Sequence, residues 1–162
     1  MNKRPCSRRW TEAAVLVLSI TASAAAAPSA PDVGVDQAHL IRPAELALIL
    51  RSPEARKPLV LQIGFRILYE QAHIPGSEYV GSASDAAGLS RLRARLQGLP
   101  KDAAIVLYCG CCPWSRCPNV RPAYAALEAM GFQNAKILWI SDNFGAEWVD
   151  KGYPVDRPGT TR

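Results

Sequence analysis

Three segments of the chain consist almost entirely of apolar residues, and each is short enough to form one strand. They are residues 58–64, 103–109 and 135–140. Continuous apolar runs of this length are typical of strands that are covered on both faces. Apolar positions recur at helical spacing between these segments, so strands and helices alternate along the chain. This alternation predicts an α/β fold with a parallel sheet.

Four helices are predicted around the strands. The first begins at Pro43, where the missing N–H of proline costs nothing, and the third is closed by Gly131 as a C-cap. In the second, leucines mark one face and arginines the other, and we expect the arginine face to be solvated. The four helices comprise residues 43–51, the segment around 89–99, residues 120–130 and residues 144–151.

The first 26 residues have the pattern of an export signal. Basic residues precede a short apolar run at residues 13–20, and small residues then offer cleavage sites after Ala24 or Ala26. The apolar run is shorter than the roughly 20 residues of a membrane-spanning helix, which favours a cleaved signal over a membrane anchor. We therefore expect a periplasmic or secreted protein.

The length of 162 residues fits one domain. We expect a signal peptide at 1–26, a flexible lead-in at 27–38, the folded domain at 39–157 and a tail at 158–162. The formal net charge of +5 falls to +2 without the signal, which carries four basic residues and one acidic residue. So small a charge does not indicate a nucleic-acid partner, and the mature chain contains no expected membrane span.

Four of the five cysteines lie within nine positions, and the first of them ends an apolar strand. Cys109 is followed by a loop and then by a helix N-terminus, where backbone N–H groups and the helix dipole favour an anion. Such surroundings lower the pKa of a thiol and give a nucleophilic thiolate. Arg116 and Arg121 could add positive charge and hold an oxyanion-bearing substrate such as a thiosulfonate.

The same cysteines allow other interpretations. A metal site is disfavoured because structural zinc prefers two separated pairs, and adjacent Cys111 and Cys112 are expected to point their side chains apart. Residues 109–112 also have the Cys-x-x-Cys spacing of redox proteins. In an oxidising compartment, Cys117 could form a structural disulfide with either Cys111 or Cys112.

Three motifs together resemble the rhodanese-like sulfurtransferases. "YCGCCPWSRCPNVRPAYAALEAMGF" resembles their active-site strand, loop and helix, and "YEQAHIPGSEYVG" resembles their His-Ile-Pro-Gly-Ala signature. "EWVDKGYPV" is similar to their closing helix and Gly-Tyr-Pro-Val segment. The motifs come in family order and span roughly residues 40–155.

The resemblance implies a central five-stranded parallel sheet flanked by helices, with Cys109 as the catalytic residue. Cys109 would take the outer sulfur of a donor such as thiosulfate as a persulfide and pass it to a thiol or cyanide. Neither a cofactor nor a metal is required. Cys112 and Cys117 are rivals for this role, and the substrate-binding loop would comprise Gly110, Cys111, Cys112, Arg116, Cys117 and Arg121.

The chain departs from the family pattern at three places. The loop after Cys109 is longer by about five residues. Gln62-Ile63-Gly64 stands where the family has Asp-Val-Arg, and Asp142-Asn143 stands where it has Gly-Gly. The alternative function is a noncatalytic module that binds copper or zinc, or a thiol/disulfide redox protein acting through the cluster from Cys109 to Cys117.

Several other residues have structural interpretations that we favour over functional ones. His73 is expected to bind backbone and fix the turn at Pro75 and Gly76 rather than to act as a general base. Trp148 and Tyr153, with Pro154, are expected to close the core. Trp114 could either form a wall of the site or simply pack, and Arg116 could instead order the loop.

Overall fold

Five parallel strands form one sheet in the computed structural model, which describes residues 35–158. Their order across the sheet is β1-β5-β4-β2-β3, so β4 is the central strand. The strands are β1 (Leu40–Ile41), β2 (Leu59–Gln62), β3 (Glu78–Tyr79), β4 (Ile105–Tyr108) and β5 (Ala135–Leu138). The predicted α/β fold with a five-stranded parallel sheet is confirmed.

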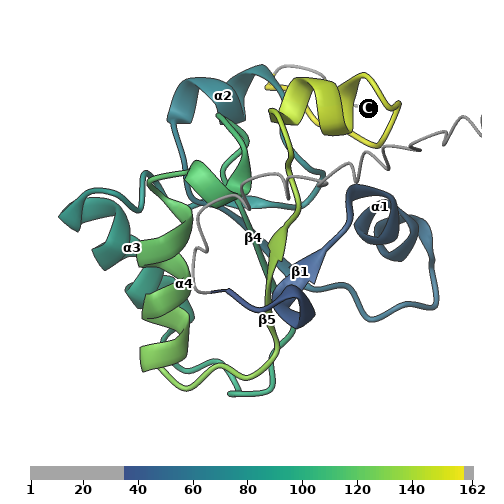
Figure 1. Ribbon diagram of the computed structural model, residues 1–162. Coiled ribbons are helices and arrows are strands. Elements are labelled where there is room, and N and C mark those ends of the chain that lie inside the picture. Colours follow the sequence, from purple (N-terminus) through teal and green to yellow (C-terminus); the bar gives the residue numbers. More distant parts are fainter. Residues whose placement is uncertain (1–34, 159–162) are drawn as a thin grey trace, which may run out of the picture.

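Helices cover both faces of this sheet. In Figure 1, α3 and α4 lie side by side on one face and α1 lies on the other. The longer helices are α1 (Pro43–Arg51), α2 (Arg66–Gln71), α3 (Ala86–Leu96) and α4 (Val120–Ala129). Short 3-10 helices are η1 (Gln37–His39) and η2 (Trp114–Arg116), and η3 (Gly145–Val149) is a π-helix.

The two faces of the sheet carry separate hydrophobic cores because successive side chains of a strand point to opposite faces. In β4, Leu107 packs beneath α3 and α4 with Leu92 and Leu127. Its neighbour Val106 faces the other way, into a core that contains Leu46 of α1 and Trp148 of η3. Burial on both faces explains why the central strands are continuously apolar.

Most predicted elements agree with the structure, and two details differ. The last helix, predicted for residues 144–151, is a π-helix of five residues. The arginine face of α3 is only partly solvated, because Arg95 pairs with Glu78 and Nε of Arg91 donates to the Val80 carbonyl oxygen over 3.0 Å. These arginines therefore hold the edge strand β3 to the helix.

The predicted export signal lies outside the described residues, as do the lead-in up to residue 34 and the end of the tail. Within residues 35–158, no helix is both long enough and apolar enough to span a membrane.

Candidate functional site

Cys109 lies immediately beyond β4, at the carboxyl end of the central strand. Gln62 ends the neighbouring strand β2, directly opposite Tyr108, and is buried. Its Nε2 donates to the Cys109 carbonyl oxygen over 3.1 Å, and its Oε1 accepts from the Gly64 amide over 3.1 Å. The side-chain amide of Gln62 therefore fixes the backbone on which the Cys109 thiol is mounted.

Two glycines leave the space that this arrangement needs. A Cβ on Gly64 would lie 2.7 Å from Sγ of Cys109, closer than van der Waals contact allows. Gly110 has a φ of +85°, and a Cβ there would lie 2.8 Å from Cβ of Phe144. The Gly110 carbonyl oxygen also accepts from the Phe144 amide over 3.0 Å, so the cysteine loop lies directly against the segment before η3.

The four thiols form one cluster. Sγ of Cys111 lies 3.3 Å from that of Cys109, 3.1 Å from that of Cys112 and 3.9 Å from that of Cys117. The expectation that Cys111 and Cys112 point apart is therefore wrong, because the loop turns tightly enough to bring both sulfurs together. All four cysteines are free thiols in this structure, so the pairing of Cys117 with Cys111 or Cys112 remains a prediction.

Asn119 connects this cluster to the loop that precedes α3. It is fully buried just before α4, and its Nδ2 donates to Sγ of Cys109 over 3.3 Å. Its Oδ1 accepts from the Ser82 hydroxyl over 2.7 Å and from the Ser84 amide over 2.9 Å. Since these bonds fix the orientation of the side-chain amide, one N–H is aimed at the Cys109 sulfur.

The negative charge of the cluster is placed on Cys117. The pKa of Cys117 is lowered to about 6, chiefly by the hydrogen bond from the Cys109 thiol and also by one from the Asn119 backbone N–H, which together outweigh the effect of burial. The same interaction with Cys117, together with burial, raises the pKa of Cys109 above the ordinary thiol range. The expected lowering of the Cys109 pKa is thus found at Cys117, which lies closer to the N-terminus of α4.

The outer part of the cluster is more accessible than the inner part. Cys109 and Cys117 are each only 4% exposed, whereas Cys111 and Cys112 are half-buried. Burial raises the pKa of Cys112 to about 12. Cys111 and Gly110 line a cleft of about 640 Å³ bounded by α2 and η3, into which Phe144 and Arg157 also extend.

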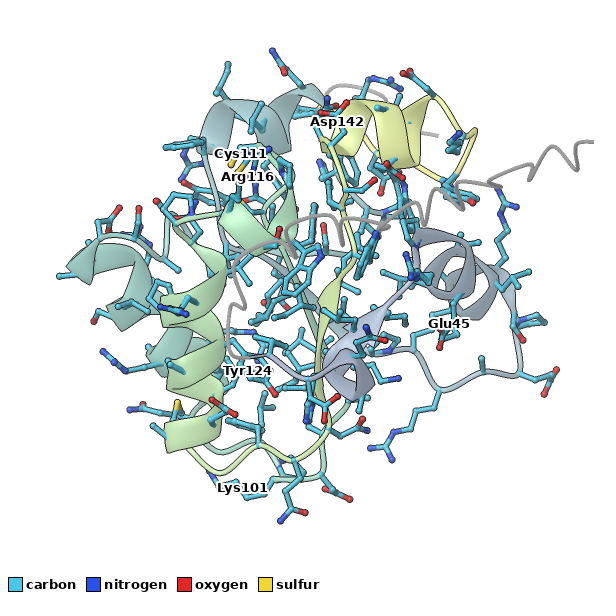
Figure 2. All side chains as sticks on the ribbon, in the orientation of Figure 1. Glu45, Lys101, Cys111, Arg116, Tyr124 and Asp142 are labelled. Carbon is cyan, nitrogen blue, oxygen red and sulfur yellow. The ribbon has the colours of Figure 1, made fainter. Side chains whose placement is uncertain are left out.

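The two predicted arginines lie on the outside of the loop and of the helix that follows it. Arg116 is exposed in η2, and Arg121 is exposed in the first turn of α4. Figure 2 shows that Arg116 and Cys111 both lie at the end of the molecule where α2 lies. The binding of an oxyanion by Arg116 and Arg121 therefore stays a prediction.

Trp114 packs rather than lining the cleft. Its ring lies 5.6 Å from that of Trp139, and its backbone N–H donates to the Ile140 carbonyl oxygen over 2.8 Å. The Arg42 guanidinium lies 3.9 Å from the centre of the Trp139 ring. These contacts tie the enlarged loop to the end of β5.

The structural interpretations of His73 and Trp148 are supported. Nδ1 of His73 lies 2.8 Å from the Tyr69 carbonyl oxygen, and its ring stacks on that of Tyr69. Trp148 is completely buried, and its Nε1 donates to the Pro154 carbonyl oxygen over 2.8 Å. The ring of Tyr153 packs edge-on against that of Trp148.

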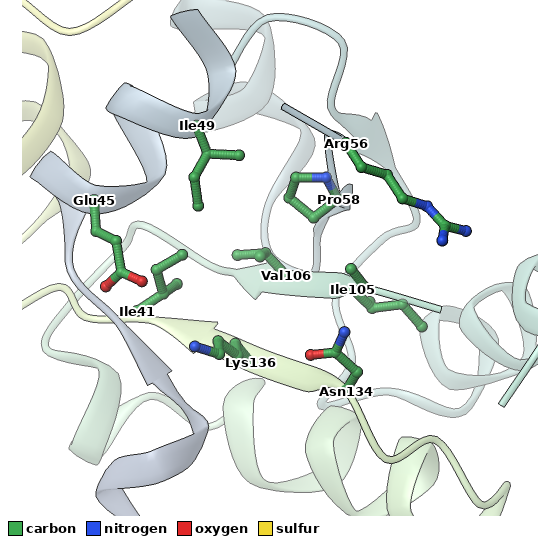
Figure 3. Close-up of a pocket in the computed structure, with 10 residues that line it drawn as sticks. Ile41, Glu45, Ile49, Arg56, Pro58, Ile105, Val106, Asn134 and Lys136 are labelled. Carbon is green, nitrogen blue, oxygen red and sulfur yellow. The ribbon is translucent and has the colours of Figure 1, made fainter. Parts of the chain in front are cut away.

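A smaller cavity lies away from the cysteines, between α1 and the amino-terminal parts of β4 and β5 (Figure 3). Its volume is about 190 Å³, and Glu45, Arg56 and Lys136 are its charged lining residues. In a parallel α/β sheet, ligands bind beyond the carboxyl ends of the strands. The cavity at the opposite end is therefore a poorer candidate site than the cleft beside Cys111.

Sequence reasoning missed the residues that position the thiol. The sequence marks Gln62 and Gly64 only as departures from a family pattern, and it gives no local sign of a role for Asn119. One available signal was the polar Gln62 at the end of an apolar strand, because a buried amide must find partners. Nothing local in the sequence indicates that Asn119 would contact Ser82 and Ser84, which lie more than thirty positions earlier.

Comparison with known proteins gives one family. The family model described as "Rhodanese-like domain" matches residues 45–139, which is more than half of the chain. No curated protein matches the chain.

Solved structures support the fold. The rhodanese-like domain of the Alr3790 protein from Anabaena sp is 20% identical, with a TM-score of 0.54; the match covers 76% of this chain and 83% of that one. The BH2092 protein from Bacillus halodurans is 18% identical, with a TM-score of 0.56; the match covers 74% of this chain and 77% of that one. At these identities the likeness is one of fold.

Proposed function

The chain belongs to the rhodanese-like domain family and so to the sulfurtransferase superfamily, and from this we propose that it transfers sulfane sulfur through a cysteine persulfide. The donor would be a small molecule such as thiosulfate, and the acceptor a thiol or cyanide. Cys109 is the proposed carrier of the sulfur.

The surroundings of the Cys109 sulfur are the observation that carries this proposal. The Asn119 side-chain N–H and the Cys111 backbone N–H both point at Sγ of Cys109. Gly64 leaves the sulfur the space that any side chain would remove. Two N–H donors beside one strand-end thiol are suited to hold the anionic outer sulfur of a persulfide.

Cys109 and Cys117 share one proton through a hydrogen bond, and Cys117 is placed to take that proton as Cys109 reacts. With a pKa of about 6, Cys117 is a thiolate at neutral pH and accepts a hydrogen bond from the Cys109 thiol. In the proposed step the proton moves from Cys109 to Cys117 as the Cys109 sulfur attacks the outer sulfur of thiosulfate. The S–S bond of thiosulfate breaks and sulfite leaves with its electron pair, so that a Cys109 persulfide anion and a neutral Cys117 thiol remain.

The second half of the cycle returns the protein to its starting state. An acceptor thiolate, or cyanide, attacks the outer sulfur of the persulfide and releases the Cys109 sulfur with the bonding electron pair. Cys109 then recovers its proton from Cys117. No electrons are gained or lost overall, because the sulfane sulfur moves between two sulfur atoms or to carbon.

The cleft beside Cys111 offers a route for these small molecules. Arg157 is the charged residue among those described in its lining, and the lining includes no acidic side chain. A positively charged residue in the lining favours an anionic donor. The half-buried Cys111 separates the cleft from the inner thiols, so the donor would approach along this side of the loop.

We further propose that the protein works after export, in the periplasm or outside the cell. The basic, apolar and small-residue order of residues 1–26 supports this. An oxidising location would require a reductant to keep the four thiols free.

Sulfur loading tests the proposed function directly. The reduced protein is incubated with thiosulfate, and its intact mass is measured for a gain of about 32 Da, the mass of one sulfur atom. Cys109→Ser should show no gain. Cys112→Ser, the matched control within the same loop, should load fully.

A variant of Cys117 separates the base from the carrier. Cys117→Ser should load about 100-fold more slowly at neutral pH, because a positioned base contributes on that scale, and should recover at alkaline pH. Loading that persists in Cys109→Ser would contradict the role of Cys109. If Cys117→Ser took up no sulfur at any pH, the sulfur would be assigned to Cys117 instead.

Thiol/disulfide exchange is a second candidate, favoured by the short sulfur separations around Cys111. Its Sγ lies within 3.3 Å of both Cys109 and Cys112. Equilibration with glutathione buffers, followed by mass measurement, would show a loss of about 2 Da for each disulfide formed. A disulfide whose potential matches the glutathione pool, without any sulfur loading, would favour this function.

A further inference from the structure

We propose that the thiolates of Cys109, Cys111 and Cys117 form a binding site for one Cu(I) ion. This goes beyond the proposed sulfur transfer, although it uses the same carrier residue. The three residues come from one loop, and their sulfur atoms all lie within 4.8 Å of one another.

The sulfur separations match those of a single metal centre. Sulfur ligands at about 2.3 Å from a common metal lie about 3.8–4.0 Å apart in tetrahedral or trigonal geometry. Here Cys111 and Cys117 are 3.9 Å apart, Cys109 and Cys111 are 3.3 Å apart, and the third separation does not exceed 4.8 Å. Small side-chain rotations would therefore make the three distances equal without a change of backbone.

The donor set selects a soft, low-coordinate ion. The group contains three thiols and neither a histidine nor a carboxylate among the described residues. Thiolates select Cu(I), whereas a structural zinc ion almost always takes four ligands. Cys112 contacts Cys111 over 3.1 Å and also hydrogen-bonds to Cys117, but its sulfur is not among the three that all lie within 4.8 Å of one another, so the geometry favours a three-coordinate ion.

The groups around the three sulfurs also favour a bound metal ion. Asn119 donates its side-chain N–H to the Cys109 sulfur, the kind of outer contact that orients a ligand and spreads its charge. Cys117 lies three residues before α4, whose N-terminus favours the negative charge of a trithiolate complex. Cys111 lines the cleft, which gives the ion a path from solvent to the two buried thiols.

Copper and sulfur would exclude each other at this site. A Cu(I) ion bound to Cys109 removes the thiolate that attacks the sulfur donor, and a persulfide on Cys109 alters the ligand. We therefore expect copper-loaded protein to gain no sulfur from thiosulfate until a chelator removes the metal.

The test is an anaerobic titration of the reduced full chain with Cu(I) in competition with a chromogenic Cu(I) chelator. Wild type and Cys112→Ser should each bind one ion with the same affinity. Cys111→Ser should bind more weakly by more than the roughly 10–100-fold that loss of an outer contact costs. Cys111 is half-buried, so its replacement should spare the core, and circular dichroism should show that both variants are folded.

X-ray absorption of the copper-loaded protein should give three sulfur neighbours. Equal affinities of Cys111→Ser and Cys112→Ser, or no binding stronger than that of the chelator, would overturn the site. Four sulfur neighbours, or tight Zn(II) binding that Cys112→Ser abolishes, would overturn the three-thiolate copper assignment. The titration uses no thiosulfate, so its failure is distinct from a failure of sulfur loading.

Discussion

Gln62 and Gly64 show how single residues set the position of one sulfur atom. Both ends of the Gln62 side-chain amide are hydrogen-bonded to the backbone around the thiol. The NH₂ group donates to the Cys109 carbonyl oxygen, and the amide oxygen accepts from the Gly64 N–H. Gly64 has an ordinary φ, so a glycine is needed there for space and not for conformation. A side chain at this position would force either the sulfur or the strand to move.

Gly64→Ala should therefore abolish sulfur loading while the fold is retained. Its Cβ would lie 2.7 Å from the Cys109 sulfur and 3.1 Å from the Cys109 carbonyl oxygen. Such overpacking costs about 1–3 kcal/mol of unfolding free energy. Urea denaturation and mass spectrometry measure the two effects.

Gly98→Ala is the matched control for that prediction. Gly98 has a φ of +77° and open space around it, so alanine there costs about 1–2 kcal/mol through conformation alone. This variant should lose similar stability and still load sulfur. Equal loading in the two variants would show that Gly64 does not position the thiol.

The pKa of Cys117 predicts the pH dependence of sulfur loading. Below pH 6 Cys117 is protonated and cannot take the proton of Cys109, whereas above pH 6 it is a thiolate and can. The loading rate should rise with pH through a midpoint near 6 and then level off. A midpoint near the ordinary thiol value of about 8.5 would contradict Cys117 as the base.

Among the secondary-structure elements, the three inner strands could be predicted and the two outer ones could not. β2, β4 and β5 are buried on both faces and therefore form apolar runs. β1 and β3 are two residues long, too short to show any period, and they pair only along one edge. α2 spans only six residues, none of which is buried, so its sequence does not show the apolar spacing that would predict a helix.

The site was predictable as a strand end but not as a network of contacts. The apolar run before Cys109 was enough to place the thiol at the carboxyl end of a strand. The position of Cys111 beside Cys112 depends on the turn of the loop, and the contact of Asn119 with Ser82 depends on how β3 leads into α3. Contacts between segments that are distant in the chain leave no periodic pattern in the local sequence, so the sequence does not predict them.

The cysteine loop and η3 meet at Gly110, where the two segments have almost no free space between them. Gly110→Ala should lower the free energy of unfolding by about 1–2 kcal/mol through its positive φ. A further loss of about 1–3 kcal/mol should follow from the contact with Phe144. Urea denaturation gives both values together.

Gly131→Ala separates these two contributions. Gly131 has a φ of +82°, nearly that of Gly110, but a Cβ there would meet only Lys101 Cδ at 4.0 Å. Its cost should be the conformational one alone. Equal destabilisation by the two substitutions would show that the loop and η3 do not constrain each other.

For the molecule as a whole, the covering of both sheet faces explains how the two inner thiols of the cluster stay buried. Cys109 and Cys117 belong to the core beneath α3 and α4, while Tyr108 belongs to the core beneath α1. The cluster therefore lies where the larger core reaches the end of the sheet. The stability of the site depends on the complete sheet, including the edge strand β1 far from it in sequence.

A pair of truncated chains tests this dependence. Residues 35–158 contain all five strands and should have the same free energy of unfolding as the full chain. Residues 43–158 lack β1, which pairs with β5 through Leu40 and Ile41, and they also lack Val35.

Ile41 and Val35 are both buried, so removing them should cost about 3–6 kcal/mol at about 1.5–3 kcal/mol for each side chain. Loss of β1 also leaves β5 as an unprotected edge, which favours association between chains. Urea denaturation and gel filtration should therefore show a weakened, aggregating protein for residues 43–158 and a stable one for residues 35–158. If the two chains were equally stable, β1 would not be part of the structure that holds the thiol cluster.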